Sequence, residues 1–170
     1  HGLLKKRIMI LIDEYADTLL LKALEGLRTD TDATRCIHFK FAGLPELKKI
    51  PALRDKLIAA ARKHIASPNT KIYLCEDGDI FILAPHLATK DAKAMILETT
   101  GALGIAAHQG IAALHEASIT LYQLLIAVEH KLEAKRNALA EAQKIYAETM
   151  AARKRERILS GGGGGQQSPA

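Results

Sequence analysis

Residues 71–84 read KIYLCEDGDIFILA and carry the strongest secondary-structure signal of the chain. Two runs rich in β-branched and aromatic residues flank an acidic tetrad, Glu76-Asp77-Gly78-Asp79. Because glycine accepts the positive φ that tight hairpin turns require, an Asp-Gly pair between two apolar runs predicts a β-hairpin. The other segments are expected to lie on or beside this hairpin.

Length and composition limit the class of protein. The chain has 170 residues, which fits one domain or a small domain with an appendage. Aromatic residues make up only 4% and Trp is absent, which favours helix-rich packing over an all-β sandwich. No apolar run reaches about 18 residues, so no membrane span is expected. The sequence shows no signal peptide, and a cytoplasmic location is therefore predicted.

The two cysteines, Cys36 and Cys75, lie far apart and form no CxxC pair. Both fall in predicted strands, where a cysteine behaves as a small apolar side chain in a reducing compartment. Their spacing alone does not decide between a disulfide and two separate thiols.

Apolar residues recur at steps of three and four from residue 3 to residue 27, which predicts an N-terminal helix. The same region offers a second interpretation, because residues 7–17, RIMILIDEYAD, are similar to a Walker B strand that ends in Asp13-Glu14. That chemistry also needs a glycine-rich GxxxxGK[ST] loop to hold phosphates, and the sequence contains none.

Residues 35–42 alternate apolar and polar side chains and predict a half-buried strand. A helix is expected over 53–65, and another from Thr89 or Asp91 to about Glu98. With the hairpin between them, these elements resemble half of a ferredoxin-like β-α-β-β-α-β sheet.

Residues 111–159 contain no Pro or Gly and follow alternating steps of four and three, which predicts one long helix with a heptad seam. A helix of this length either pairs with a second chain, folds back on the first helix, or projects from the domain. The interaction seam comprises Leu114, Leu121, Leu125, Val128, Leu132 and Leu139, and its pattern is strong through Leu132 and weaker after it.

The predicted fold class is therefore α+β, with a small three-stranded sheet between an N-terminal helix and a long coiled-coil-like C-terminal helix. The boundaries are 1–32 for the first helix, 33–104 for the small domain and 105–159 for the long helix. Residues 160–170, SGGGGGQQSPA, are expected to form a disordered, glycine-rich tail.

One family resemblance follows from the hairpin. Residues 73–83, YLCEDGDIFIL, are similar to the signature hairpin of GGDEF domains, the diguanylate cyclases, which reads approximately YRxGGDEFxxL. His38-Phe39-Lys40 resembles the end of that family's first strand. The resemblance implies a GGDEF-like sheet.

The departures from this family concern its chemistry. In the family, two glycines admit GTP and acidic residues serve metal binding and catalysis. Here Glu76 and Asp77 occupy both glycine positions, and Cys36 and Ile37 stand where the family has a metal-binding aspartate. The resemblance thus implies a degenerate, catalytically inactive member.

No catalytic residues, metal site or cofactor are assigned from the sequence. Glu76, Asp77 and Asp79 form a candidate cation or nucleotide site, because Mg²⁺ and Ca²⁺ prefer oxygen ligands. A solvated acidic turn explains the same residues.

The leading functional hypothesis is a non-enzymatic signalling or scaffold module that acts by helix-mediated dimerisation or by docking a partner helix. A cyclase-like enzyme that binds nucleotide is one alternative. A second is a nucleic-acid or acidic-lipid binder that uses the basic residues of 153–157, and its nucleic-acid form is disfavoured because no aromatic residues are interleaved with them.

Overall fold

A computed structural model describes residues 9–30, 32–44, 46–47, 50, 52–104 and 110–167, with the backbone alone for 162–167. Contacts within the chain divide it into two compact units, His1–Glu129 and His130–Ala170. The described part of the first unit is an α+β domain built on a five-stranded mixed sheet.

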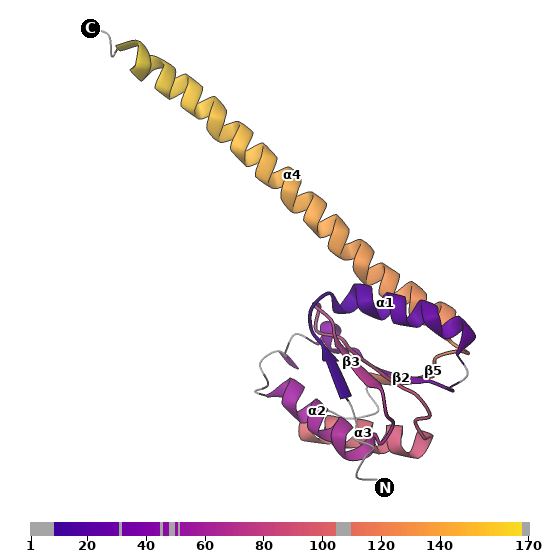
Figure 1. Ribbon diagram of the computed structural model, residues 1–170. Helices are drawn as coiled ribbons and strands as arrows, with labels where there is room; N and C mark the ends of the chain where they lie inside the picture. Colours follow the sequence, from indigo (N-terminus) through magenta and orange to yellow (C-terminus); the bar gives the residue numbers. More distant parts are fainter. Residues whose placement is uncertain are drawn as a thin grey trace. The chain divides into compact units, whose positions relative to one another are not determined.

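The elements follow one another along the chain as shown in Figure 1. The strands are β1 (Met9–Ile12), β2 (Arg35–Phe39), β3 (Thr70–Leu74), β4 (Ile80–Ala84) and β5 (Ala112–Glu116). The α-helices are α1 (Ala16–Gly26), α2 (Leu53–His64), α3 (Thr89–Ala102) and α4 (Leu121–Gln167). Two 3-10 turns are η2 (Leu27–Thr29) and η3 (Phe41–Gly43).

The order of the strands in the sheet is β1-β3-β4-β2-β5. β1 pairs with β3 in parallel, and all the other neighbours are antiparallel. The chain from β2 to β5 follows a β-α-β-β-α-β path, with β4 and β2 at the centre.

The predicted hairpin is confirmed. β3 and β4 pair antiparallel, with Leu74 opposite Ile80. The connection is a five-residue loop over 75–79. Gly78 has a φ of 105° in this loop, a conformation that a residue with a side chain rarely adopts.

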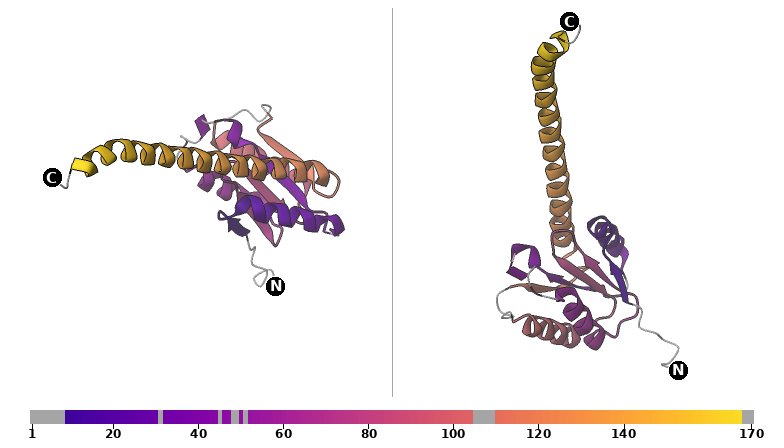
Figure 2. Two further views of the ribbon diagram at one scale, coloured as in Figure 1. Left: turned by 90° about the horizontal axis from the view of Figure 1, so that it is seen from above. Right: turned by 90° about the vertical axis from the view of Figure 1, so that its left-hand side faces the viewer.

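Both faces of the sheet are covered by helices, which Figures 1 and 2 show from three directions. One apolar cluster joins Ile37, Ile72 and Ile82 of the central strands to α2 and α3. The opposite cluster joins alternate residues of the same strands, including Tyr73 and Phe81, to α1 and to the first turns of α4. Because successive side chains of a strand point to opposite faces, a strand between two helical layers needs apolar side chains on both faces, and β4 is apolar throughout.

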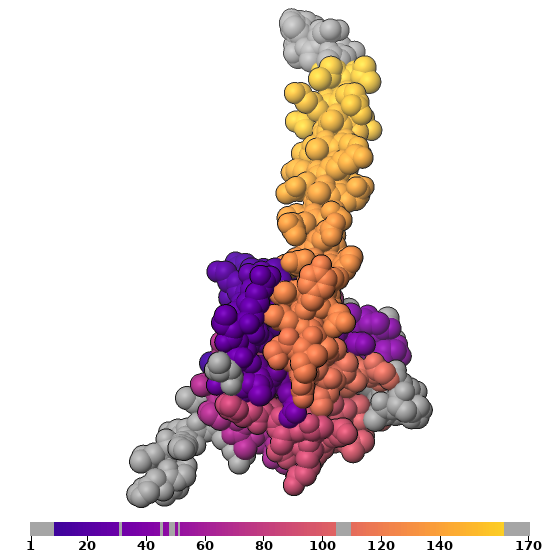
Figure 3. Space-filling view, turned by 90° about the vertical axis from the view of Figure 1, so that its right-hand side faces the viewer, coloured from indigo at the N-terminus to yellow at the C-terminus, as the bar shows by residue number. Residues whose placement is uncertain are grey.

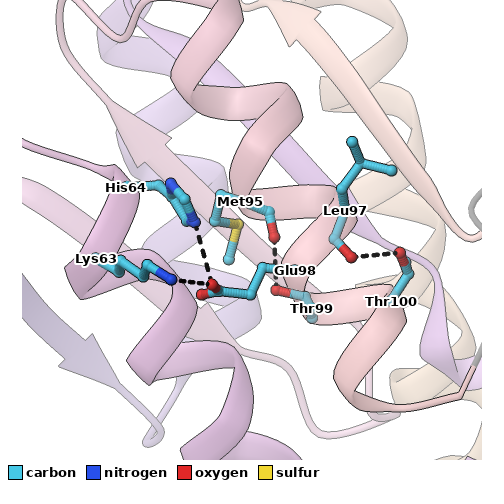
Figure 4. A network of polar contacts seen from close by, with 7 residues as sticks. All are labelled: Lys63, His64, Met95, Leu97, Glu98, Thr99 and Thr100. Atoms are coloured by element: carbon cyan, nitrogen blue, oxygen red, sulfur yellow. Dashed lines mark hydrogen bonds and ion pairs between the residues drawn. The ribbon is translucent and has the colours of Figure 1, made fainter.

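Charged side chains also connect α2 to α3, as Figure 4 shows. Lys63 Nζ donates to Glu98 Oε1 at 2.6 Å, and His64 Nε2 lies 3.5 Å from the same oxygen. The hydrogen bond from Lys63 is the main cause that lowers the pKa of Glu98. On α3, the hydroxyls of Thr99 and Thr100 donate to backbone carbonyls of the preceding turn.

The predicted N-terminal helix is wrong over residues 9–12. These residues form β1, and the helix begins only at Ala16. Parallel pairing of Ile10 with Lys71 and of Leu11 with Ile72 is a long-range interaction that short-range periodicity does not report. Tyr15 separates strand from helix with a φ of 53°. Positions 3–8 of the predicted helix lie outside the described residues.

The predicted start of the long helix is also wrong. Residues 112–116 form β5, which pairs with β2, and α4 begins at Leu121. The segment Ala-Ala-Leu-His-Glu has no strong strand preference by itself, so pairing with β2 overrides its local propensity. The sheet therefore has five strands instead of the three that were predicted.

Two smaller predictions also change. β2 was expected to be half-buried and to reach residue 42, but Cys36–Phe39 are all buried and the strand ends at Phe39. α4 extends to Gln167, through most of the tail that was predicted to be disordered. Glycine can adopt helical dihedral angles, although each one costs about 0.5–1 kcal/mol relative to Ala.

Among the described residues, every helix is too short or too polar to cross a lipid bilayer.

The first turns of α4 lie beside α1 over the sheet, as the orange and indigo side chains of Figure 3 show. We expect Leu124→Ala to lower the free energy of unfolding by about 2–5 kcal/mol, because Leu124 is only 2% exposed and its loss leaves a cavity. Chemical denaturation followed by circular dichroism measures this change.

Ile126→Ala is the matched control on the same helix. Ile126 is 40% exposed, so the loss should stay below about 1 kcal/mol. Equal losses for the two variants would contradict the packing of α4 on the sheet.

Candidate functional site

The hairpin loop and the start of α2 border one pocket of about 590 Å³. Ala52 and the first residues of α2, 53–55, line one side of it, and Leu74, Cys75, Glu76, Gly78 and Ile80 line it from the hairpin. The structure thus places part of the predicted acidic tetrad at the rim of a pocket.

Asp79 faces the domain interior and not this pocket rim. It is 5% exposed, and its Oδ2 lies 2.8 Å from Nε2 of His38. Its Oδ1 accepts the backbone N–H of Ala42 at 2.8 Å. One carboxylate thereby connects the start of β4 to the end of β2 and to η3, and both of its oxygens serve this structural role.

Asp77 shapes the loop. Its Oδ1 accepts the backbone N–H of Asp79 at 3.0 Å, which is an Asx turn. The backbone of Cys75 closes the same loop, because its N–H donates to the carbonyl of Asp79 and its carbonyl accepts the N–H of Gly78. Glu76 is exposed. The structure therefore separates the three predicted carboxylates into one buried, one loop-forming and one exposed side chain.

The α2 side of the pocket begins at a sharp corner. Ala52 has a φ of 56° and, as an alanine, provides no side-chain cap for the first turn of the helix. Its carbonyl accepts the N–H of Lys56, which starts the helical hydrogen bonds. Arg54 and Asp55 lie in this first turn, so charges of both signs border the pocket.

His38 is a buried residue that the sequence pattern places on the exposed side of its strand. Its ring stacks on Phe81, with 3.9 Å between the ring centroids and 13° between the planes. The family resemblance pointed to His38 only as part of a strand end. The partnership with Asp79 spans 41 positions, and no local signal indicates it.

Other titratable groups on the sheet are partly or fully buried, and burial shifts their pKa values. His115 on β5 lies 3.2 Å from the hydroxyl of Thr120, and burial is the main cause that lowers the pKa of its imidazole. Burial also raises the pKa of the Cys36 thiol to about 12, and Cys36 and Cys75 are both buried and form no disulfide. Within the described residues, no three His, Cys, Asp or Glu side chains gather in a way that could hold a metal ion.

The residues of the predicted helical seam lie in different elements and differ in burial. Leu114 lies on β5, and its side chain packs against the α2–α3 cluster. Leu125 and Val128 are buried against the sheet, with Leu121 partly buried beside them. Leu132 is half-buried and Leu139 is 59% exposed in the second unit.

In comparisons with known proteins, no family model, no curated protein and no solved structure matches this chain.

The role of Asp79 can be measured by unfolding. We expect Asp79→Ala to cost about 1–3 kcal/mol, because it leaves the buried imidazole of His38 and the partly buried N–H of Ala42 without their acceptor. Asp79→Asn should cost less, since its amide oxygen can still accept the N–H of Ala42.

Glu76→Ala is the control within the same loop and should stay within about 0.5 kcal/mol of the unmodified chain. If Asp79→Ala proved as stable as Glu76→Ala, the pair with His38 would not support the fold.

Proposed function

We propose that this chain is a non-enzymatic signalling or scaffold module that dimerises through the part of α4 beyond residue 129. The observation that carries the proposal is a row of apolar side chains at intervals of seven, Leu132, Leu139 and Tyr146. Leu139 and Tyr146 are 59% and 67% exposed. A heptad spacing of apolar residues is typical of helices that pair in a coiled coil.

The surroundings of this row support pairing. Ala142 lies between Leu139 and Tyr146 at the alternating step of three and four, and Met150 follows one turn after Tyr146. Residues 130–159 contain eight Lys or Arg and four Glu, so the rest of this helix is strongly polar. A helix with one apolar stripe and polar flanks gains most of its stability by burying that stripe.

We further propose that the compact unit is a ferredoxin-like domain of degenerate GGDEF type. The β-α-β-β-α-β path from β2 to β5 and the strand order β3-β4-β2-β5 support the ferredoxin-like topology. The use of Asp79 inside the domain supports the inactive form, because cyclase chemistry needs convergent carboxylates that hold divalent cations.

The helix-pairing proposal is tested by amide hydrogen exchange read out segment by segment. We expect residues 132–150 to exchange more slowly as protein concentration rises, because pairing protects the helical hydrogen bonds. Leu139→Glu/Tyr146→Glu should abolish this concentration dependence.

Ala140→Glu/Ala147→Glu is the matched control. It adds the same two charges at the same spacing, one position away from the stripe, and should leave the concentration dependence intact. Exchange over 132–150 that is independent of concentration in the unmodified chain would refute dimerisation through α4.

The second candidate function is nucleotide binding, and the pocket beside Glu76 and Gly78 favours it. Its volume of about 590 Å³ falls within the range of small-molecule sites. Under the leading proposal, titration of GTP or ATP with Mg²⁺ should give no heat of binding in calorimetry.

Heat that disappears in Arg54→Glu but persists in Arg28→Glu would favour the nucleotide-binding candidate instead. Arg54 lines the pocket, whereas Arg28 belongs to η2 and does not line it.

A further inference from the structure

Strand β1 is one edge of the sheet. It pairs with β3 on one side, and no strand in the described residues pairs with its other side. An unpaired edge offers a row of backbone N–H and C=O groups that can accept another strand. Natural proteins usually protect such an edge with charges, proline or a bulge.

The side chains of β1 provide no such protection. Its four residues are Met9, Ile10, Leu11 and Ile12, all of them apolar. Ile10 and Leu11 are each 41% exposed, and as successive residues of a strand they point to opposite faces of the sheet. Apolar surface is therefore exposed on both sides of this edge.

The other edge, β5, differs from β1. Its exposed end carries Glu116, whose carboxylate lies 3.2 Å from the guanidinium of Arg35. His115 adds a second polar side chain to the strand. The protection expected of an edge is thus present on β5 and missing from β1.

The charges before and after β1 favour a second copy of this chain as the strand that pairs with its free edge. Asp13 and Glu14 follow the strand and are exposed, whereas the sequence before it contains Lys5, Lys6 and Arg7. In an antiparallel pair of two copies, the basic residues that precede the strand in one copy are opposite the acidic residues that follow it in the other. In a parallel pair, like charges are opposite each other.

We propose that β1 pairs antiparallel with β1 of a second copy of this chain, so that one sheet runs through both domains. The contact is isologous, because the same strand serves on both sides of a two-fold axis. It combines main-chain hydrogen bonds with burial of Ile10 and Leu11. It does not depend on the helix-mediated contact.

The test uses the full chain with Leu139→Glu/Tyr146→Glu, in which pairing through α4 is removed. Light scattering should give the mass of a dimer, and residues 9–12 should exchange their amide hydrogens more slowly as concentration rises. Adding Ile10→Lys should convert the dimer to a monomer. Adding Ile119→Lys should not, since Ile119 is 74% exposed outside β1.

A monomer in the Leu139→Glu/Tyr146→Glu background at every concentration would overturn this proposal while leaving the one on α4 untouched. So would a dimer that Ile10→Lys leaves intact. Circular dichroism of the Ile10→Lys chain establishes that it is folded, and a folded dimer of Leu11→Lys would equally count against the contact.

Charge exchange provides a test of the antiparallel orientation in the same background. Asp13→Lys/Glu14→Lys and Lys6→Glu/Arg7→Glu should each weaken the dimer, since each places like charges at both ends of the strand pair. A mixture of the two variants should recover a heterodimer. A mixture that remains monomeric would exclude the antiparallel arrangement.

Discussion

Strand β4 is buried along its whole length, from Ile80 to Ala84, and this burial determines where the other elements lie. Its alternate side chains enter two separate apolar clusters, so each face of the sheet needs its own helical layer. α2 and α3 supply one layer. α1 alone does not complete the other, and the first turns of α4 contribute Leu124, Leu125 and Val128 to it. The start of the long helix is therefore part of the domain core.

The hydrogen bond between Asp79 and His38 follows from the same burial. The loop over 75–79 enters β4 at the edge of the core, and a carboxylate there needs partners because burial of an unpaired charge is costly. His38 and the N–H of Ala42 satisfy it. The position at which the family resemblance expects an acidic residue for chemistry thus holds one that fastens two strands together. We regard this as the main physical support for a non-catalytic domain.

Local sequence patterns predicted those elements that are determined by their own residues and not by long-range pairing. The hairpin depends on Asp-Gly between apolar runs, and α2 and α3 depend on their own apolar faces, so all three were predicted. β1 and β5 take their strand conformation from pairing with β3 and β2. The seam residues Leu125 and Val128 follow a heptad pattern equally well whether they face a partner helix or the sheet, and their sequence does not distinguish the two. The sequence pointed to the loop over 75–79, but the contact between Asp79 and His38 joins residues 41 positions apart, and no local pattern indicates it.

The four tyrosines, combined with the absence of Trp, give the chain a set of natural fluorophores. Tyr73 is buried against α1, whereas Tyr15, Tyr122 and Tyr146 are 80%, 75% and 67% exposed. Tyr146 is the one tyrosine after residue 129, and Tyr15 closely follows β1. Ultraviolet emission and its quenching by small solutes can therefore report on the helix and on the sheet edge without any attached dye, once each tyrosine is replaced in turn by phenylalanine.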